Sequence, residues 1–520
     1  MGNKNPIKIL RNFKQKLILA KIKFITIKIL REVNEWPQPD SELVYIFSPH
    51  RSNTREPFYT VLARELTRKG FEAYFLVQGT VYNSYRFSLN FKGKTISNSL
   101  SVAGFPLVFR STIFDKRQFN HEADFKNEKY LIDKIDFFPI IKSSLTSANK
   151  RLNLDFSSSE ILSQAKKAAD ACDLLLAYFY LFRDFANENS KKIRILITQF
   201  IDLPNSVFKF LSDHFECEEV QCITVLPALN KYYFRGDWKN WKYIISNLNK
   251  RKLDFGIEVS PDELDSIRKI SSEVSDICKS IEKVVLRPVE QAHNLEQKRE
   301  IQEIQNLSDE YRSRGKSVFV LFGHLFYDLA VIDSSVVFND LCEWIKKTIS
   351  FFKDRGDLLI LKPHIAELSR APNETLETFT KEFCKLSDNI RLLHPNSFSL
   401  YEISKIMDCG LVWTSSVAME LVYLEVPCVI AGNPVYRALS LNYASSEQNY
   451  FEQIENWKQI KVTPEQKNDV ACYTYFLEKM QSYPLDVLDG HGWKKSHLNE
   501  YLEKGSHEAD RLIQALIKEA

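Results

Sequence analysis

Short apolar runs alternate with helical stretches along this chain, and no other feature restricts its fold as strongly. In the second half, these runs lie at 317–323, 358–364, 410–416 and 427–432, with helical patterns at 336–353 and 372–386. A nearly continuous apolar strand must be covered on both faces, which is typical of a parallel sheet flanked by helices. The alternation therefore predicts an α/β fold of the Rossmann kind.

The first half repeats the alternation in a less regular form. Strand-like runs lie at 43–48, 73–79, 192–198 and 220–226, with helical patterns at 57–69, 160–186 and 205–213. A chain of 520 residues is too long for one hydrophobic core. We therefore expect two Rossmann-like domains facing a central cleft. The expected division is a basic segment 1–35, a first domain 40–290 with helical excursions, a helical connection 291–315, a second domain 316–475 and C-terminal helices 476–520.

Charge and cysteine usage exclude several classes of protein. The net charge of +3 comes from 70 basic and 67 acidic side chains, which gives no reason to expect a nucleic-acid partner. The nine cysteines are scattered, and the nearest pair, Cys217 and Cys222, lacks metal-ligand spacing. We expect a reducing compartment, with no disulfides and no structural metal. No run approaches the ~18 apolar residues of a transmembrane helix, and no signal peptide is evident.

The N-terminal segment is basic and amphipathic. Residues 1–31 hold nine Lys or Arg and no acidic residue, and an apolar stripe recurs at helical spacing from Leu10 to Ile27. An anionic membrane surface would cover both faces of such a helix, with each nearby cation contributing ~1 kcal/mol. Packing on the protein's own body or on a second subunit is the alternative. We expect the membrane surface.

Polar side chains follow four successive strand candidates of the second half. In parallel α/β sheets, ligands bind outside the carboxyl ends of the strands. Lys362 and His364 could neutralise a phosphate leaving group, and the hydroxyls and N–H groups at 414–416 would bind the same anion. Glu420 would lie near ribose hydroxyls. The polar residues are His324, Asp328, Lys362, His364, Glu367, Thr414, Ser415, Ser416, Glu420 and Tyr436.

Each of these residues also has a simpler explanation. A Lys-Pro-His after a strand is often only a loop, and Thr-Ser-Ser at a helix start is a common N-cap. Their placement at four consecutive strand ends is what favours a site.

These motifs resemble those of the bacterial capsule and surface polysaccharide glycosyltransferases, including the Kdo-transferase-like proteins. The family's strand, His-x-x-x-Asp-like segment and Trp-bearing helix are similar to GHLFYDLA (323–330) and FNDLCEWIKKTI (338–349). Its Lys-x-His-Pro-x-Glu-like motif stands here as KPHIAE (362–367), with Ile365 where proline is usual. Its Glu-bearing helix and Gly-x-Pro-Val strand resemble 399–443. The likeness covers about 310–460 well and 190–240 loosely.

The resemblance implies a GT-B fold and a metal-independent, cofactor-free glycosyltransferase, cytoplasmic and peripheral on the inner membrane. Its donor would be a CMP-, UDP- or GDP-linked sugar, and its acceptor a growing surface polysaccharide or lipid-linked glycan. The donor would bind at His324, Lys362, His364, Glu367, Thr414, Ser415, Ser416, Glu420 and Tyr436.

The acceptor hydroxyl commonly needs a general base. His50 and Asp202 each lie just beyond a strand candidate of the first half, and Asp328 is a candidate from the second half. His394 is followed by Pro395 and so forms a His-Pro pair, but we interpret it as a loop residue before a helix.

Two other functions remain open at this point. A nucleotide-sugar epimerase on the same scaffold would share the phosphate contacts, although it has no need of a basic N-terminus. A non-catalytic polysaccharide-assembly subunit is favoured by Ile365 and opposed by the joint presence of the other motif residues.

Overall fold

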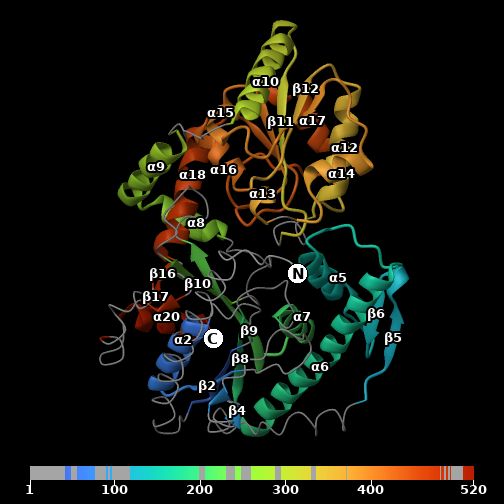
Figure 1. The fold of residues 1–520 in the computed structure, drawn as a ribbon. Helices are drawn as coiled ribbons and strands as arrows, with labels where there is room; N and C mark the ends of the chain where they lie inside the picture. The colour runs from blue at the N-terminus through green and yellow to red at the C-terminus, as the bar shows by residue number, and fades with distance from the viewer. Residues whose placement is uncertain are drawn as a thin grey trace, which may run out of the picture.

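Two sheets with separate hydrophobic cores organise the chain, the first mixed and the second parallel (Figure 1). The computed structural model describes residues 41–47, 56–75, 90–91, 94–95, 118–197, 205–229, 241–247, 259–286, 294–328, 335–370, 372–480, 482–484, 488–489, 492–493, 500 and 507–519. The basic segment 1–31, His50 and Asp202 lie outside these residues, so their predicted roles stay predictions.

The first sheet has six strands in the order β16-β10-β9-β8-β1-β2. The strands β2, β1, β8 and β9 are parallel, whereas β10 and β16 pair antiparallel at one side. Their bounds are β1 (Leu43–Phe47), β2 (Glu72–Phe75), β8 (Lys192–Ile197), β9 (Val220–Leu229), β10 (Trp241–Asn247) and β16 (Ser482–Pro484).

The helices of this half are α2 (Glu56–Arg68), α5 (Phe138–Asn149), α6 (Ser159–Asn189) and α7 (Asn205–Phe215). The long helix expected at 160–186 is confirmed as α6, which begins where the Ser158 side chain accepts from the N–H of Ile161. Buried Val44 and Ile46 of β1 share one core with α5, α6 and α7. Between β2 and α5, the described residues form short elements: β3 (Asn90–Phe91), β4 (Lys94–Thr95), β5 (His121–Asp124), η3 (Phe125–Asn127), β6 (Lys129–Ile132) and β7 (Ile135–Asp136).

The second sheet has five parallel strands in the order β13-β12-β11-β14-β15. Four of the five were expected from the apolar runs, and β13 was not, because the charged Arg391 interrupts its apolar pattern. The bounds are β11 (Val318–Phe322), β12 (Leu358–Lys362), β13 (Ile390–Leu392), β14 (Cys409–Val412) and β15 (Cys428–Ile430).

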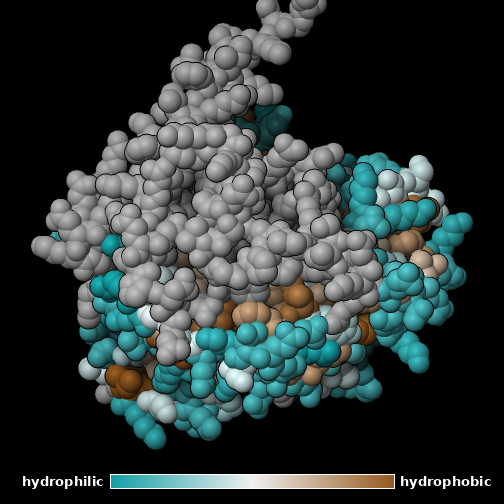
Figure 2. All heavy atoms as spheres, turned by 90° about the horizontal axis from the view of Figure 1, so that it is seen from below, coloured by the Kyte–Doolittle hydropathy of each residue, from teal (hydrophilic) through white to brown (hydrophobic). Residues whose placement is uncertain are grey.

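Both faces of the second sheet are buried, as the apolar runs predict. Along β11, Val318, Val320 and Phe322 belong to one core, and Phe319 and Leu321 belong to the core on the opposite face. Figure 2 shows that the described surface seen from below is mainly hydrophilic, with groups of hydrophobic side chains within it. The helices around this sheet are α12 (Leu341–Lys353), α13 (Ala366–Arg370), α14 (Leu376–Phe383), α15 (Leu400–Ser404), α16 (Val417–Tyr423) and α17 (Glu447–Glu455), with η5 (Trp457–Gln459).

Two helices begin later than expected because capping residues set their starts. The pattern predicts a helix from 336, but α12 begins at Leu341, since the Asp340 carboxylate accepts from the N–H of Glu343 at 2.8 Å. The helix expected at 372–386 is α14 alone, which starts after the capping residue Thr375.

The segment that follows β10 and precedes β11 in the sequence forms three helices: α8 (Pro261–Arg268), α9 (Ser271–Val285) and α10 (Leu295–Ser313). After the second sheet the chain forms α18 (Pro464–Tyr475) and the π-helix η6 (Phe476–Met480), and then returns to the first sheet through β16. The last described helix, α20 (His507–Glu519), packs against α2, where Asp510 pairs with Arg68 at 2.8 Å. Between β16 and α20 in the sequence, the chain forms a hairpin of β17 (Leu488–Asp489) and β18 (Gly492–Trp493).

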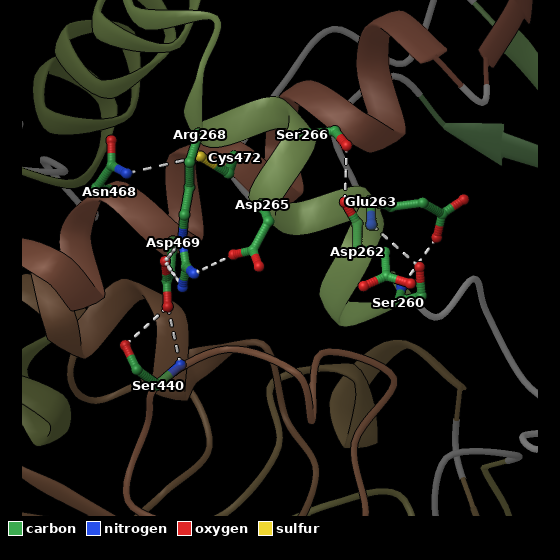
Figure 3. Close-up of polar contacts among 10 residues, drawn as sticks. All are labelled: Ser260, Asp262, Glu263, Asp265, Ser266, Arg268, Ser440, Asn468, Asp469 and Cys472. Carbon is green, nitrogen blue, oxygen red and sulfur yellow. Dashed lines mark hydrogen bonds and ion pairs between the residues drawn. The ribbon is translucent and has the colours of Figure 1, made fainter.

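A buried carboxylate holds α8 to α18 (Figure 3). Asp469 is fully buried; one of its oxygens accepts from Nε and Nη2 of Arg268 at 3.0 and 2.6 Å. The other oxygen accepts from the backbone N–H and hydroxyl of Ser440 at 3.0 and 2.7 Å. Within the part of the chain that the structure describes, no helix is long and apolar enough to cross a membrane.

Candidate active site

The strand order of the second sheet marks one place for a ligand. From β11 the chain proceeds to β12 and β13 on one side, and later to β14 and β15 on the other. The direction of winding therefore reverses between β11 and β14, and parallel α/β sheets bind ligands outside the strands at such a point. The polar segments after β11, β12 and β14 all begin at this edge of the sheet.

Gly323 and His324 follow β11 directly. The N–H of Gly323 donates to the Lys362 carbonyl at 2.8 Å, which holds the segment against the end of β12. A Cβ at Gly323 would lie 3.0 Å from Leu376 and 3.2 Å from that carbonyl, so the close approach favours glycine. The sequence therefore sets His324 beside the segment that carries His364.

The two imidazoles lie face to face. The ring centroids of His324 and His364 are 6.0 Å apart, with 26° between the ring planes. His324 is 6% exposed, and its Nδ1 atom has no hydrogen-bond partner among the described residues. A buried nitrogen without a partner is costly unless a ligand or water satisfies it.

Both imidazoles are held neutral. Burial lowers the pKa of His364 to about 4, and the neighbouring His324 lowers it as well, whereas Asp328 opposes the shift. Burial also lowers the pKa of His324. The N–H of Ala366 donates to Nδ1 of His364 at 3.1 Å, so the proton of the neutral ring is on Nε2. His364 therefore offers an N–H donor without a positive charge.

Lys362, at the end of β12, is 9% exposed, and its ammonium donates to the Pro395 carbonyl at 2.6 Å. Burial lowers the pKa of Lys362 to about 8, against the opposing effect of Glu300, Glu367 and Glu402. The amine is thus mostly cationic at pH 7 and already binds a loop.

That loop is fixed by α10. Glu300 accepts from the N–H of His394 at 3.1 Å and also bonds the hydroxyl of buried Ser397. Sequence reasoning missed Glu300, because a carboxylate within a charged helix carries no motif. His394 itself is exposed, in agreement with its interpretation as a loop residue.

Glu367 supports the site from within. Its side chain is buried, and its carboxyl oxygen accepts from the N–H of Leu376 at 3.3 Å. Burial raises the pKa of Glu367 to about 7. Ile365, where the family pattern has proline, is 53% exposed, so its side chain is not part of the buried support.

The segment after β14 completes the edge. Thr414 is buried, and Ser415 and Ser416 are half-buried at the start of α16. Tyr436 is 1% exposed and donates its hydroxyl hydrogen to the Ser415 carbonyl at 2.6 Å. Tyr436 thus holds the backbone of this turn through the Ser415 carbonyl.

The hydroxyls of Ser415 and Ser416 differ in their hydrogen bonds to α16. The Ser415 hydroxyl accepts from the N–H of Val417 at 3.3 Å, whereas Ser416 makes no side-chain capping bond to the helix. A Cβ at Gly432 would lie 2.7 Å from Thr414, which explains why the end of β15 carries glycine. Glu420 is half-buried in the first turn of α16.

Of the three base candidates, the structure places Asp328 alone. Asp328 is half-buried in a turn where its N–H donates to the Leu325 carbonyl at 3.0 Å, and its charge acts on both imidazoles. Among the described residues, no group of three or more His, Cys, Asp or Glu side chains is arranged to hold a metal ion.

Comparisons with known proteins give only distant similarities. No protein-family model and no curated protein match the chain. Among solved structures, it is similar to the beta Kdo 2,7 transferase KpsC of Thermosulfurimonas dismutans, with 14% identity over 62% of this chain and 89% of that one, at a TM-score of 0.30. The UDP-GlcNAc 2-epimerase of Neisseria meningitidis shares 11% identity over 92% and 99% of the two chains, with a TM-score of 0.22. The catalytic domain of starch synthase IV from Arabidopsis thaliana shares 11% identity over 90% and 99%, with a TM-score of 0.25.

Proposed function

We propose that this protein is a metal-independent glycosyltransferase that moves a sugar from a CMP-, UDP- or GDP-linked donor to a growing surface polysaccharide or lipid-linked glycan. The donor lies at the carboxyl ends of β11, β12 and β14. In this proposal the two sheets are the cores of two domains that face a cleft, as in a GT-B fold.

One observation carries the proposal: two neutral imidazoles, that of buried His324 and that of half-buried His364, share the edge of the sheet where its winding reverses. The unpartnered Nδ1 of His324 calls for a ligand, and Nε2–H of His364 is a donor suited to a phosphate oxygen. Preorganised donors of this kind stabilise the negative charge that develops on a departing phosphate. A neutral donor avoids the cost of burying an unpaired cation in the absence of the ligand.

The remaining residues have supporting roles. Lys362 holds the loop at Pro395 and contributes positive charge near the phosphate. Hydroxyls of Thr414, Ser415 and Ser416 contact the same anion, and Glu420 contacts ribose hydroxyls. Glu367 and Tyr436 hold the two segments in place.

The acceptor proton is taken by His50, Asp202 or Asp328. Asp328 has the support of its proximity to the two imidazoles. The basic segment 1–31 brings the enzyme to an anionic membrane surface, where a lipid-linked acceptor would be found.

The test is an incubation of the full-length protein with CMP-, UDP- and GDP-sugars and a lipid-linked or oligosaccharide acceptor. A transferase releases free nucleotide, and acceptor mass increases by one sugar. An isomerised sugar nucleotide with no acceptor product would instead identify an epimerase. Absence of both products with every donor would contradict an enzymatic role.

A further inference from the structure

Glu374 links the second sheet's donor segment to the first half of the chain. The side chain is 5% exposed. Its Oε2 atom accepts from the backbone N–H of Leu152 at 2.6 Å and of Asn153 at 3.3 Å, and Oε1 accepts from the Asn153 amide at 2.5 Å. All three donors come from the connection between α5 and α6. We refer to Glu374 with these two partners as the clamp.

Two hydrogen bonds flank the clamp, and each of the two segments donates one of them to the other. Asn373 donates its side-chain amide hydrogen to the carbonyl of Asn149, the last residue of α5, at 2.7 Å. Lys150 donates to the carbonyl of Arg370, the last residue of α13, at 2.6 Å. The final carbonyls of a helix lack partners inside it, so each segment satisfies the end of a helix in the other.

The clamped segment is the one that carries the site. His364 and Glu367 lie between β12 and α14, and Glu374 lies just before the capping residue Thr375. Leu376, in the first turn of α14, donates to Glu367, and Ala366 donates to His364. One end of the segment is therefore fixed by β12, and the other is fixed by the clamp.

We propose that Glu374 is a positioning residue, through which the connection between α5 and α6 sets the geometry of His364 and Glu367. The inference rests on the proposed function, because it treats these residues as part of the donor site. A nucleotide that orders the donor segment must then also order residues 150–158, since coupling between two sites acts equally in both directions.

The experiment compares backbone hydrogen exchange in the full-length protein and the variant Glu374→Ala, with and without millimolar UDP, CMP or GDP. Glu377→Ala is the matched control, because Glu377 is 58% exposed and pairs with Lys381 across one helical turn. In the wild type and in the control, the nucleotide that binds slows exchange both at 362–370 and at 150–158. In Glu374→Ala, the protection at 150–158 is lost, and the Kd for the nucleotide rises about tenfold.

A merely structural role gives a different result. Faster exchange at 150–158 in Glu374→Ala, with unchanged exchange at 364–376 and an unchanged nucleotide Kd, would overturn the positioning role. If the wild type binds none of the three nucleotides, the proposed donor site fails, and exchange at 364–376 in the unliganded variant decides whether Glu374 positions this segment. Should Glu374→Ala not fold, Asn153→Ala removes one of the three donors, and we expect the same changes at smaller amplitude.

Discussion

At the scale of single residues, the proposed contact with the donor phosphate depends on a neutral His364. The bond from Ala366 to Nδ1 fixes the proton on Nε2, and burial holds the pKa at about 4. Its folded pKa lies below the usual 6.5, so the unfolded chain binds the proton more readily. The contribution of this group to stability is full above pH 6.5 and is lost as the pH falls toward 4.

Replacing His364 by Ala should strongly lower donor turnover and leave the fold intact. The loss of one preorganised donor commonly lowers kcat by ~10²- to 10³-fold, and a polar side chain at a strand end contributes little to packing. Release of free nucleotide measures turnover, and circular dichroism checks the fold. His121→Ala, which alters an exposed histidine of β5, is the control. Unchanged turnover in folded His364→Ala would refute the assignment of the phosphate contact.

Glu367 predicts a pH dependence of the opposite sign. Burial raises its pKa from 4.5 to about 7, so the folded protein retains a proton that the unfolded chain releases. The associated stability is full below pH 4.5 and is lost as the pH rises through 7. Relative to wild type, Glu367→Gln should therefore gain about 2 kcal/mol in unfolding free energy between pH 5 and pH 8. Urea unfolding at both pH values measures this gain. Glu382→Gln, which alters an exposed carboxylate of α14, is the control, and an equal gain in both variants would exclude a special environment at Glu367.

At the scale of elements, the sequence predicted strands better than helix ends. Apolar runs such as 317–323 and 358–364 specify strands buried on both faces, and the alternation of Phe319 and Val320 between two cores bears this out. Helix starts depend on single capping residues, such as Asp340 and Thr375, and the spacing of apolar residues does not identify these. The strand β13 was missed because the charged Arg391 interrupts its apolar run.

The ion pair at Asp469 should be the main bond between α8 and α18. Asp469→Ala leaves Arg268 and Ser440 without their shared acceptor. Asp469 is fully buried but Arg268 is 33% exposed, so the cost should be below that of a fully buried pair, on the order of 2 kcal/mol. Urea unfolding measures the cost. Asp265 also pairs with Arg268 but is 63% exposed, so Asp265→Ala should cost below about 1 kcal/mol. Equal costs in the two variants would show that burial does not set the strength of this contact.

At the scale of the whole molecule, strand-end residues were predictable, whereas the supports Glu300 and Glu374, which act from distant segments, were not. Lys362, His364 and Thr414 follow apolar runs, so their placement at one edge follows from parallel topology. Glu300 and Glu374 act across long sequence separations, and nothing near them in sequence indicates their partners. The return of the chain to β10 through β16 is likewise a pairing across distant segments, invisible to local patterns.

The most direct test of the proposed donor site is thermal unfolding of the full-length protein with millimolar CMP, UDP or GDP, in the wild type and in His364→Ala. A ligand that binds only the folded state at a hundred times its Kd adds about 2.7 kcal/mol of stability. We expect one nucleotide to raise the Tm of the wild type selectively and to have a much smaller effect on the Tm of the variant. No shift with any nucleotide, or an equal shift in His364→Ala, would contradict a donor site at the ends of β11, β12 and β14.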